Sequence, residues 1–319
     1  MLEKIADYIR TNKIILEKEE LNPIVRFIST NSFKSPRIFS DVGQDSAAID
    51  NKSEMYTLVT TDRIKTSYIE KYPFGAGFSS ILVGVDDIFA CGGTPLAATI
   101  IISFKEQNIG QKMIEGICNG SNKFKVPIIR GHTNTKDYYE LSSTLIGEIK
   151  RTDYIPADNA RENDNIILAV DFDGQIGRAS NLHWDTVTHK SSKVVLNKRL
   201  AMNIIAKEHL VNSSKDVSNG GIFGTILQLL KYSNVGADIN VEKIVIPPKL
   251  VEKGYQLETY VQMFLTTSYI LTAPEKTSQE VIKTFNNHDM SAALIGRIRN
   301  ESELNIADSK DSMKVLEFL

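Results

Sequence analysis

The chain of 319 residues is long enough for about two ordinary domains, and its 42% hydrophobic and 24% charged residues are typical of a globular protein with a sizeable core. Lys plus Arg number 37 and Asp plus Glu 39, so the net charge of −2 excludes a strongly basic nucleic-acid-binding protein and a polybasic membrane-surface protein. No apolar run approaches the ~18 residues needed to span a bilayer, and two cysteines cannot form a disulfide framework or a four-thiolate metal site. Because the acidic start of the chain is unlike a signal peptide, we expect a cytoplasmic protein.

Helix and strand patterns alternate along the first half of the sequence. Residues 1–31 have the pattern of one or two amphipathic helices with a break near Asn22-Pro23. A helix is predicted over 77–90, where apolar residues recur at helical spacing, and Gly92-Gly93 followed by Pro95 should end it. The remaining elements predicted in this half are strands at 56–61, 96–104, 126–130 and 141–149 and a helix at 108–124.

A polar segment with a proline, residues 151–164, interrupts this pattern, and we predict the domain junction there, between domains of residues 1–150 and 151–319. Alternating helices and strands indicate an α/β or α+β protein. The elements predicted after the junction are strands at 166–170, near Ala237, at 268–271 and at 292–298, helices at 193–209 and 279–285, and a loop followed by a helix at 216–232.

Two adjacent acids, Asp86 and Asp87, stand out in the apolar helix predicted at 77–90. The segment 72–104 contains no Lys or Arg, and the positions three and four residues from either acid are apolar or glycine, so neither has a local partner. An unpaired carboxylate against apolar surface is costly. Either one of the pair faces solvent and the other meets a distant Lys or Arg, or a cation arrives from elsewhere.

Other acids occur at the ends of predicted strands and the starts of helices. Asp45 lies in a loop of small residues, Asp62 follows a strand, and Asp216 opens the loop Asp216-Val-Ser-Asn-Gly-Gly221 before an apolar helix. Such a loop at a helix N-terminus offers N–H groups and a favourable dipole to phosphate. Each acid alone can be a turn residue or a helix cap. Together they suggest a hard divalent cation that bridges to a polyphosphate.

Other candidates are weaker. His132, in Arg130-Gly-His-Thr-Asn134, is either a phosphate or metal contact or a hydrogen-bonded turn residue. His183, Trp184, Asp185 and His189 occupy a polar segment that is either substrate-binding surface or packing. The chain contains no Walker lysine motif, no GxSxG elbow and no HExxH pair, which removes the usual P-loop, serine-hydrolase and zinc-protease interpretations.

The order of these motifs resembles that of the aminoimidazole-ribonucleotide (AIR) synthase-like superfamily. This group includes thiamine-monophosphate kinase, selenophosphate synthetase, the amidotransferase that makes formylglycinamidine ribonucleotide, and the hydrogenase maturation factor that dehydrates a carbamoyl thioester. Other stretches resemble the AIR synthase-related branch that includes the methanogenesis marker 2 proteins. The stretches that carry the resemblance are Gly43-Gln-Asp-Ser-Ala-Ala48, Thr60-Thr-Asp62, Val85-Asp-Asp-Ile-Phe-Ala-Cys-Gly-Gly-Thr-Pro95, Gly131-His-Thr-Asn134, Asn181-Leu-His-Trp-Asp185 and Lys215-Asp-Val-Ser-Asn-Gly-Gly-Ile-Phe-Gly-Thr225.

The resemblance implies a fold, cofactors and site residues. It implies an N-terminal α/β domain whose sheet pairs with that of a second subunit in a homodimer, and a C-terminal α+β domain that closes an ATP cleft. Mg²⁺ would be held by the aspartates that match the family's metal ligands, Asp45, Asp62, Asp87 and Asp216, of which Asp62 and Asp87 are also the expected catalytic residues. Nucleotide contacts are expected from Thr60, Thr61, Gly131, His132, Lys215, Ser218 and Asn219.

The chain also departs from the family's pattern. Gln44 stands where many members have a second acid, and His132 and Asn219 stand where thiamine-monophosphate kinase has aspartates. A histidine at the position of His132 also occurs in selenophosphate synthetase, but no cysteine here precedes Cys91 to serve as that enzyme's reactive residue. We expect Mg²⁺-assisted transfer of the ATP γ-phosphoryl group to an oxygen of a small molecule. The alternatives are an activity like that of either of these two enzymes, a non-catalytic ATP-binding sensor or assembly protein, or a globular dimer whose aspartates are caps and ion pairs.

Overall fold

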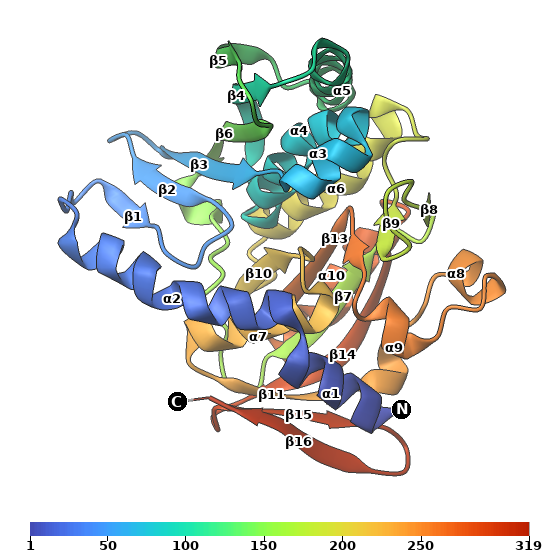
Figure 1. The fold of residues 1–319 in the computed structure, drawn as a ribbon. Helices are drawn as coiled ribbons and strands as arrows, with labels where there is room; N and C mark the ends of the chain where they lie inside the picture. The colour runs from blue at the N-terminus through green and yellow to red at the C-terminus, as the bar shows by residue number, and fades with distance from the viewer. Residues whose placement is uncertain (319) are drawn as a thin grey trace.

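Two large sheets divide the strands in chain order, and a small third sheet joins the second half (Figure 1). The computed structural model describes residues 1–318, with side chains described for all of them except 18–22. The first sheet uses strands between residues 38 and 150, and the second uses strands between 165 and 317. No strand lies between 151 and 164, where a single turn of 3₁₀ helix, η1 (Arg151–Asp153), begins the connection. The predicted combination of α/β and α+β architecture is confirmed.

The N-terminal sheet has six strands. The neighbours are antiparallel except for the parallel pair β4 and β5, which are joined through a helix. In sheet order the strands are β1 (Ile38–Ser40), β2 (Ala47–Asp50), β3 (Met55–Arg63), β6 (Glu140–Lys150), β4 (Thr94–Phe104) and β5 (Ile128–Thr135).

One face of this sheet is covered by α4 (Pro73–Ala90), against which α5 (Gln107–Phe124) packs, and α3 (Thr66–Lys71) precedes α4. The two long helices touch backbone to backbone: a Cβ on Gly77 would lie 2.0 Å from the Met113 carbonyl oxygen, so only glycine fits there. The left-handed Gly92 (φ 80°) ends the turn after α4, as predicted.

The apolar character of α4 follows from its buried place. Contrary to the sequence prediction, this helix is long and apolar enough, by length and composition, to cross a membrane, and it is the one such helix among the described residues. However, 78% of its residues are buried inside the fold. Its apolar sequence therefore matches the core helix of a folded domain.

The C-terminal sheet has seven strands with helices on both faces. Ile167 and Ala169 of its third strand join α6 and α10 in one core, whereas Ile166, Leu168 and Val170 join α7 and α1 in another. Burial on both faces explains why this strand is a continuous hydrophobic run. In sheet order the strands are β10 (Ser213–Asp216), β13 (Ser268–Ala273), β7 (Asn165–Val170), β14 (Ser291–Arg299), β11 (Gly236–Asn240), β15 (Glu303–Ala307) and β16 (Ser312–Glu317).

The first of these two cores also includes residues of α4 and of the first sheet, so the two halves share buried contacts through α4 and α6. The elements not yet given are α6 (Ser192–Lys207), α7 (Gly221–Ser233), η2 (Val241–Lys243), α8 (Pro248–Glu252), α9 (Leu257–Tyr260), α10 (Glu275–Asn286) and the three-stranded sheet of β12 (Phe264–Leu265), β9 (His183–Asp185) and β8 (Gln175–Ile176).

The predicted helix break near Asn22-Pro23 is wrong. The break is at Asn12, between α1 (Leu2–Thr11) and α2 (Lys13–Asn31), and the second helix continues through Pro23. Asn12 ends one helix and caps the next, because its side-chain oxygen accepts the N–H groups of Ile14 (2.9 Å) and Ile15 (3.2 Å). The helix α1 packs against β15 and β16, so its apolar side chains belong to the core of the second sheet.

No strand was predicted after 292–298, and this is also wrong. The hairpin of β15 and β16 follows it and adds two strands to the edge of the seven-stranded sheet. These strands are only five and six residues long, so their sequence patterns are too short to give a strong signal.

Candidate functional site

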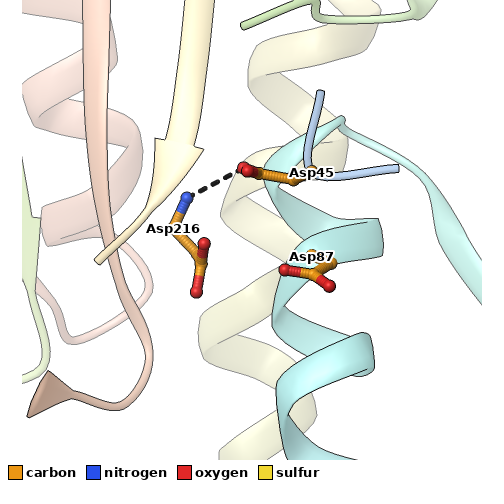
Figure 2. A group of neighbouring side chains, drawn as sticks. All are labelled: Asp45, Asp87 and Asp216. Atoms are coloured by element: carbon orange, nitrogen blue, oxygen red, sulfur yellow. Dashed lines mark hydrogen bonds between the residues drawn. The ribbon is translucent and has the colours of Figure 1, made fainter. Parts of the chain in front are cut away.

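Three aspartates from distant parts of the sequence meet where the two halves of the chain adjoin (Figure 2). Asp45 comes from the loop before β2, Asp87 from α4 and Asp216 from the last residue of β10. One carboxylate oxygen from each lies within 4.8 Å of the others. The three carboxylates face a common space between the loop, the helix and the strand.

Asp62 adds a fourth carboxylate beside Asp87, and we call these four residues the aspartate cluster. Side chains alternate along β3, so Thr60 and Asp62 share the face that looks toward α4. The Thr60 hydroxyl donates to Asp87 Oδ2 at 2.6 Å. Asp62 lies close enough to Asp87 for the two carboxyl groups to influence each other's pKa, and its Oδ2 is buried without a hydrogen-bond partner among the described residues.

The carboxylates of the cluster destabilise one another's charged forms. Burial, followed by the charges of the other three carboxylates, raises the pKa of Asp87 well above its usual value. Burial also raises the pKa of Asp62, and the interaction with Asp87 offsets part of this rise. When carboxylates share a poorly solvated site, their mutual repulsion raises their pKa values unless a cation binds between them.

One lysine, Lys215 of β10, contacts the cluster directly. Its ammonium donates to Asp45 Oδ1 and lies 3.4 Å from the carbonyl oxygen of Gly43, and its side chain is only 6% exposed. Burial alone would lower the pKa of Lys215, but the nearby carboxylates, Asp45 first, raise it overall. The lysine is therefore held as a charged group inside the site.

The donor set of the cluster fits a hard divalent cation. All of the grouped atoms are carboxylate oxygens, which are the ligands that Mg²⁺ and Ca²⁺ prefer. Among the residues whose side chains are described, none donates to the buried Oδ2 of Asp62. Both observations agree with the Mg²⁺ expected from the sequence.

The neighbouring acid, Asp86, has a different environment. It is buried, and Arg199 of α6 donates to its Oδ1 through Nε at 2.7 Å. The sequence left open whether the adjacent acids meet a distant base or a cation. The structure answers differently for each: Asp86 pairs with Arg199, and Asp87 joins the aspartate cluster.

The loop before α7 was expected to offer N–H groups to phosphate, but several of these groups have acceptors within the fold. The N–H of Ser218 donates to the Thr225 hydroxyl (3.3 Å), that of Gly221 to the Ser218 carbonyl (3.1 Å), and that of Ile222 to the Val261 carbonyl (3.0 Å). Asn219 lies in the exposed turn. The loop is thus preformed beside Asp216, with fewer available donors than predicted.

Three of the expected nucleotide contacts lie away from the cluster within one chain. Thr61 points to the opposite sheet face, where its hydroxyl meets that of Thr144 at 2.9 Å. Gly131 is on the edge strand β5, aligned with Asp62 through Ser143 and Ile100 but three strands away, or roughly 14 Å. His132 follows it and is exposed. The order of the motifs along the chain does not show how far apart their residues lie in the folded structure.

Gln44, which stands where many family members have an acid, is tied to the connection between the halves. Its side-chain oxygen accepts the N–H of Ala157 at 2.7 Å and lies 3.3 Å from the Tyr154 hydroxyl. The residue therefore anchors the loop that carries Asp45. Sequence reasoning missed this role, because the partners are more than 100 residues away.

The segment around Trp184 divides into core and surface. Trp184 is fully buried and donates through its indole to the Asp171 carbonyl at 2.9 Å, so it is a packing residue. His183 and Asp185, on either side, help to line a cavity of 350 Å³ between this segment and the beginning of α4. Tyr68 and Leu82 line the opposite wall of this cavity.

A two-domain α/β and α+β fold with an acidic site where its halves meet defines an AIR synthase-like protein. Residues 43–149 match the N-terminal domain of AIR synthase related proteins, and residues 173–309 match the C-terminal domain. The chain therefore belongs to the AIR synthase-related family, and the resemblance seen in the motifs is confirmed.

Relatives extend over nearly the whole chain. An uncharacterised protein of Methanocaldococcus jannaschii is 33% identical over 319 residues, which cover 99% of this chain and 97% of the relative. A thiamine-monophosphate kinase of Buchnera aphidicola is 24% identical over 264 residues, 79% of this chain and 81% of that enzyme. The structure of AaThiL complexed with AMPPCP and TMP matches 93% of this chain and 97% of that chain, with 20% identity and a TM-score of 0.68. This last likeness shows a shared fold.

Proposed function

We propose that the protein is an ATP-dependent enzyme that transfers the γ-phosphoryl group to an oxygen of a small molecule, with Mg²⁺ at the aspartate cluster. The observation that carries this proposal is the convergence of Asp45, Asp87 and Asp216 within 4.8 Å in a member of the AIR synthase-related family. Support also comes from a relative named as a kinase and from a neighbour of the same fold that binds AMPPCP, an analogue of ATP.

Each residue of the cluster has a distinct part in this proposal. Mg²⁺, when bound, would neutralise the charge that develops on the transferred group. Asp87 and Asp62 would supply carboxylate oxygens from a helix and a strand that are fixed by packing, and Thr60 orients Asp87. Asp216 would bring the second half of the chain to the same ion, and Lys215 holds Asp45 in place. Because phosphoryl transfer depends mainly on positioning and charge neutralisation, this arrangement can supply most of the catalysis.

We propose the cavity beside α4 as the place of the acceptor substrate. Leu82 lines this cavity, and Asp87 follows five residues later, about 7.5 Å along the helix axis. The walls of the cavity combine the ring of Tyr68 with the polar groups of His183 and Asp185, a lining suited to a ring with polar substituents.

The direct test is ADP release from Mg·ATP in the presence of metabolite pools, comparing the wild type with Asp87→Asn. We expect the variant to keep its fold and its turnover rate to fall by at least ~100-fold, because the substitution removes a charge fixed at the reacting phosphate. Asp173→Asn, at a 59% exposed side chain, is the matched control and should turn over normally. Unchanged ADP release in Asp87→Asn would contradict the proposed enzymatic function.

The departures Gln44, His132 and Asn219 motivate the second candidate, an ATP-binding sensor or assembly protein. In that case ATP raises the melting temperature without any ADP release. A protein whose aspartates are only caps and ion pairs would show neither effect.

We also propose that the protein is a homodimer that pairs through its six-stranded sheet. One face of this sheet is covered by helices, whereas Leu96, Ile101 and Ile129 on β4 and β5 are exposed. Apolar residues on a strand face outside the core are typical of an interface. Sedimentation should give twice the mass of one chain, and the double variant Ile101→Lys/Ile129→Lys should sediment as a monomer. A monomeric wild type would overturn the proposal.

A further inference from the structure

Aromatic rings form one side of the cavity beside α4. The rings of Tyr68, Tyr72 and Phe74 follow one another at the beginning of this helix: the centroids of Tyr68 and Tyr72 are 6.5 Å apart, and those of Tyr72 and Phe74 are 6.3 Å apart. A Cβ on Gly75 would lie 2.1 Å from the Tyr72 ring, so the glycine lets this ring pack against the helix backbone. A wall of packed rings suits a planar aromatic ligand, because aromatic pairs gain from stacked or edge-to-face contact beyond the area that they bury.

The acid on the cavity wall, Asp185, is already served by the protein. It is buried, and its Oδ1 accepts the N–H groups of Val187 (2.9 Å) and Thr188 (3.0 Å). Its Oδ2 accepts the Thr188 hydroxyl and the Gln175 amide (3.2 Å). Burial alone would raise the pKa of Asp185, but these hydrogen bonds lower it overall. The carboxylate is therefore ionised, and its acceptor positions are occupied.

The charge of Asp185 also has a cation nearby, the ammonium of Lys123 in α5. This ammonium donates to the carbonyl oxygen of Lys190 and lies 3.5 Å from that of Thr188, in the turn that follows Asp185. Burial lowers the pKa of Lys123, and the charge of Asp185 acts in the opposite direction. A positive charge of the protein thus offsets the negative charge on the cavity wall.

Arg178, which also lines the cavity, has no partner of this kind. Its side chain is exposed and forms no hydrogen bond or ion pair within the described part of the chain. The histidines of the wall, His183 and His189, can add only positive charge. The unpaired charge at the cavity is therefore positive. A guanidinium group presents its N–H donors in a planar fork that matches the oxygens of a carboxylate or a phosphate.

We propose that the cavity beside α4 binds a planar aromatic molecule that carries a carboxylate or phosphate group, with the ring at the aromatic wall and the anionic group at Arg178. This inference rests on the proposed function, in which the cavity holds the acceptor substrate, and it names the chemical class of that substrate. Because Arg178 is exposed whereas Asp185 is buried, the anionic group belongs at the solvent side of the cavity, where the charge of Asp185 is screened. Arg178 is then the residue that selects for the anion.

The test is a calorimetric titration of the nucleotide-free full chain with four probes of one size: naphthoate, naphthyl phosphate, naphthamide and the saturated decahydronaphthoate. We expect at least one of the two aromatic anions to bind ~10-fold or more tightly than the neutral amide, the order expected for a charge-assisted bond to a guanidinium. The tighter of the two identifies the anionic group. Decahydronaphthoate should bind at least roughly threefold more weakly than naphthoate, because it cannot stack.

Variants of Arg178 assign the preference to this side chain. Arg178→Gln removes the charge at an exposed position, so the fold should be unchanged, and the anions should bind no more tightly than the amide. Arg178→Lys keeps the charge and should retain most of the preference. Arg161→Gln, at an exposed arginine outside the cavity wall, is the matched control and should behave as the wild type.

The results that would overturn the inference are separate from those that bear on the enzyme. Equal affinities for the anions and the amide, an unchanged preference in Arg178→Gln, or decahydronaphthoate binding as tightly as naphthoate would overturn it. Absence of binding by every probe up to ~10 mM would do the same. None of these titrations uses ATP. Absence of ADP release from Mg·ATP would instead overturn the proposed function, while the probes would still decide what the cavity binds.

Discussion

Two buried clusters of charged residues in this protein have opposite balances of charge. In the second half, the carboxylate of Asp171, directly after β7, is buried against two ammonium groups: Lys190 at 2.6 Å and Lys198 at 3.2 Å. In the aspartate cluster, four carboxylates lie near the ammonium of Lys215, which donates to one of them, Asp45.

The two clusters differ in the ratio of carboxylate to ammonium groups, and this difference distinguishes a structural cluster from a candidate binding site. Asp171 has protein cations for its charge and also accepts the N–H of Asp173 at 3.0 Å, so its surroundings are complete. In the aspartate cluster, by contrast, burial and the neighbouring carboxylates raise the pKa values of Asp62 and Asp87, which is the environment expected of the proposed cation site. An excess of buried carboxylates is thus a better sign of a binding site than the presence of an acid as such.

The largest expected effect is a loss of stability when the pairing of Asp171 with Lys190 and Lys198 is broken. Asp171→Asn leaves the buried Lys198 without its anion and Lys190 with only the exposed Asp173 at 3.6 Å, so it should lower the free energy of unfolding by about 3–5 kcal/mol. Urea denaturation measures this loss. Asp173→Asn, at a 59% exposed side chain that pairs with the exposed Lys249 and lies 3.6 Å from Lys190, should change stability by less than about 1 kcal/mol. Equal losses in the two variants would show that the Asp171 cluster is not a special source of stability.

The next effect compares adjacent residues of α4. Asp86→Asn removes the anion that pairs with the buried Arg199, so we expect a loss of about 3 kcal/mol. Asp87→Asn relieves repulsion in the metal-free protein, so its stability should be equal to or greater than that of the wild type. Saturating Mg²⁺ should then stabilise the wild type, by about 2.7 kcal/mol at 100 times its dissociation constant, but not Asp87→Asn. A loss of stability in metal-free Asp87→Asn would mean that Asp87 is a structural acid like its neighbour.

The smallest effect concerns pH and the cavity beside α4. Burial lowers the pKa of His183 below its usual 6.5, so the folded protein binds fewer protons here than the unfolded chain. The contribution of this group is present above pH 6.5 and is lost as the pH falls below that value. When the pH is lowered from 7.5 to 5.5, the melting temperature should fall less in His183→Gln than in the wild type. His189→Gln, at an exposed histidine, is the control. If the melting temperature of His183→Gln falls as much as that of the wild type, His183 does not contribute to the pH dependence of stability.

Much of the fold could be predicted from local sequence. The periodicity of α4, its end at Gly92 and the apolar run of β7 are local features, and each was predicted with small errors of length. The break at Asn12 and the last hairpin were missed, because a capping asparagine and short strands give weak signals.

The site was harder to predict, because its important relations are between distant residues. The positions of the acids were visible, but the sequence did not show which of Asp86 and Asp87 has a basic partner, since Arg199 is 113 residues from Asp86. Likewise the pairing of Lys215 with Asp45 spans 170 residues. Thr61 and Gly131 lie in matching motifs, yet the alternation of β3 and the strand order carry them away from the cluster.

The most direct test is the anomalous difference map of crystals grown with Mn²⁺ and AMPPCP. We predict a peak bounded by the carboxylates of Asp87 and Asp216, with the terminal phosphate of the nucleotide on its open side. Bound nucleotide whose phosphates lie elsewhere, with no anomalous peak at these two side chains, would contradict the account.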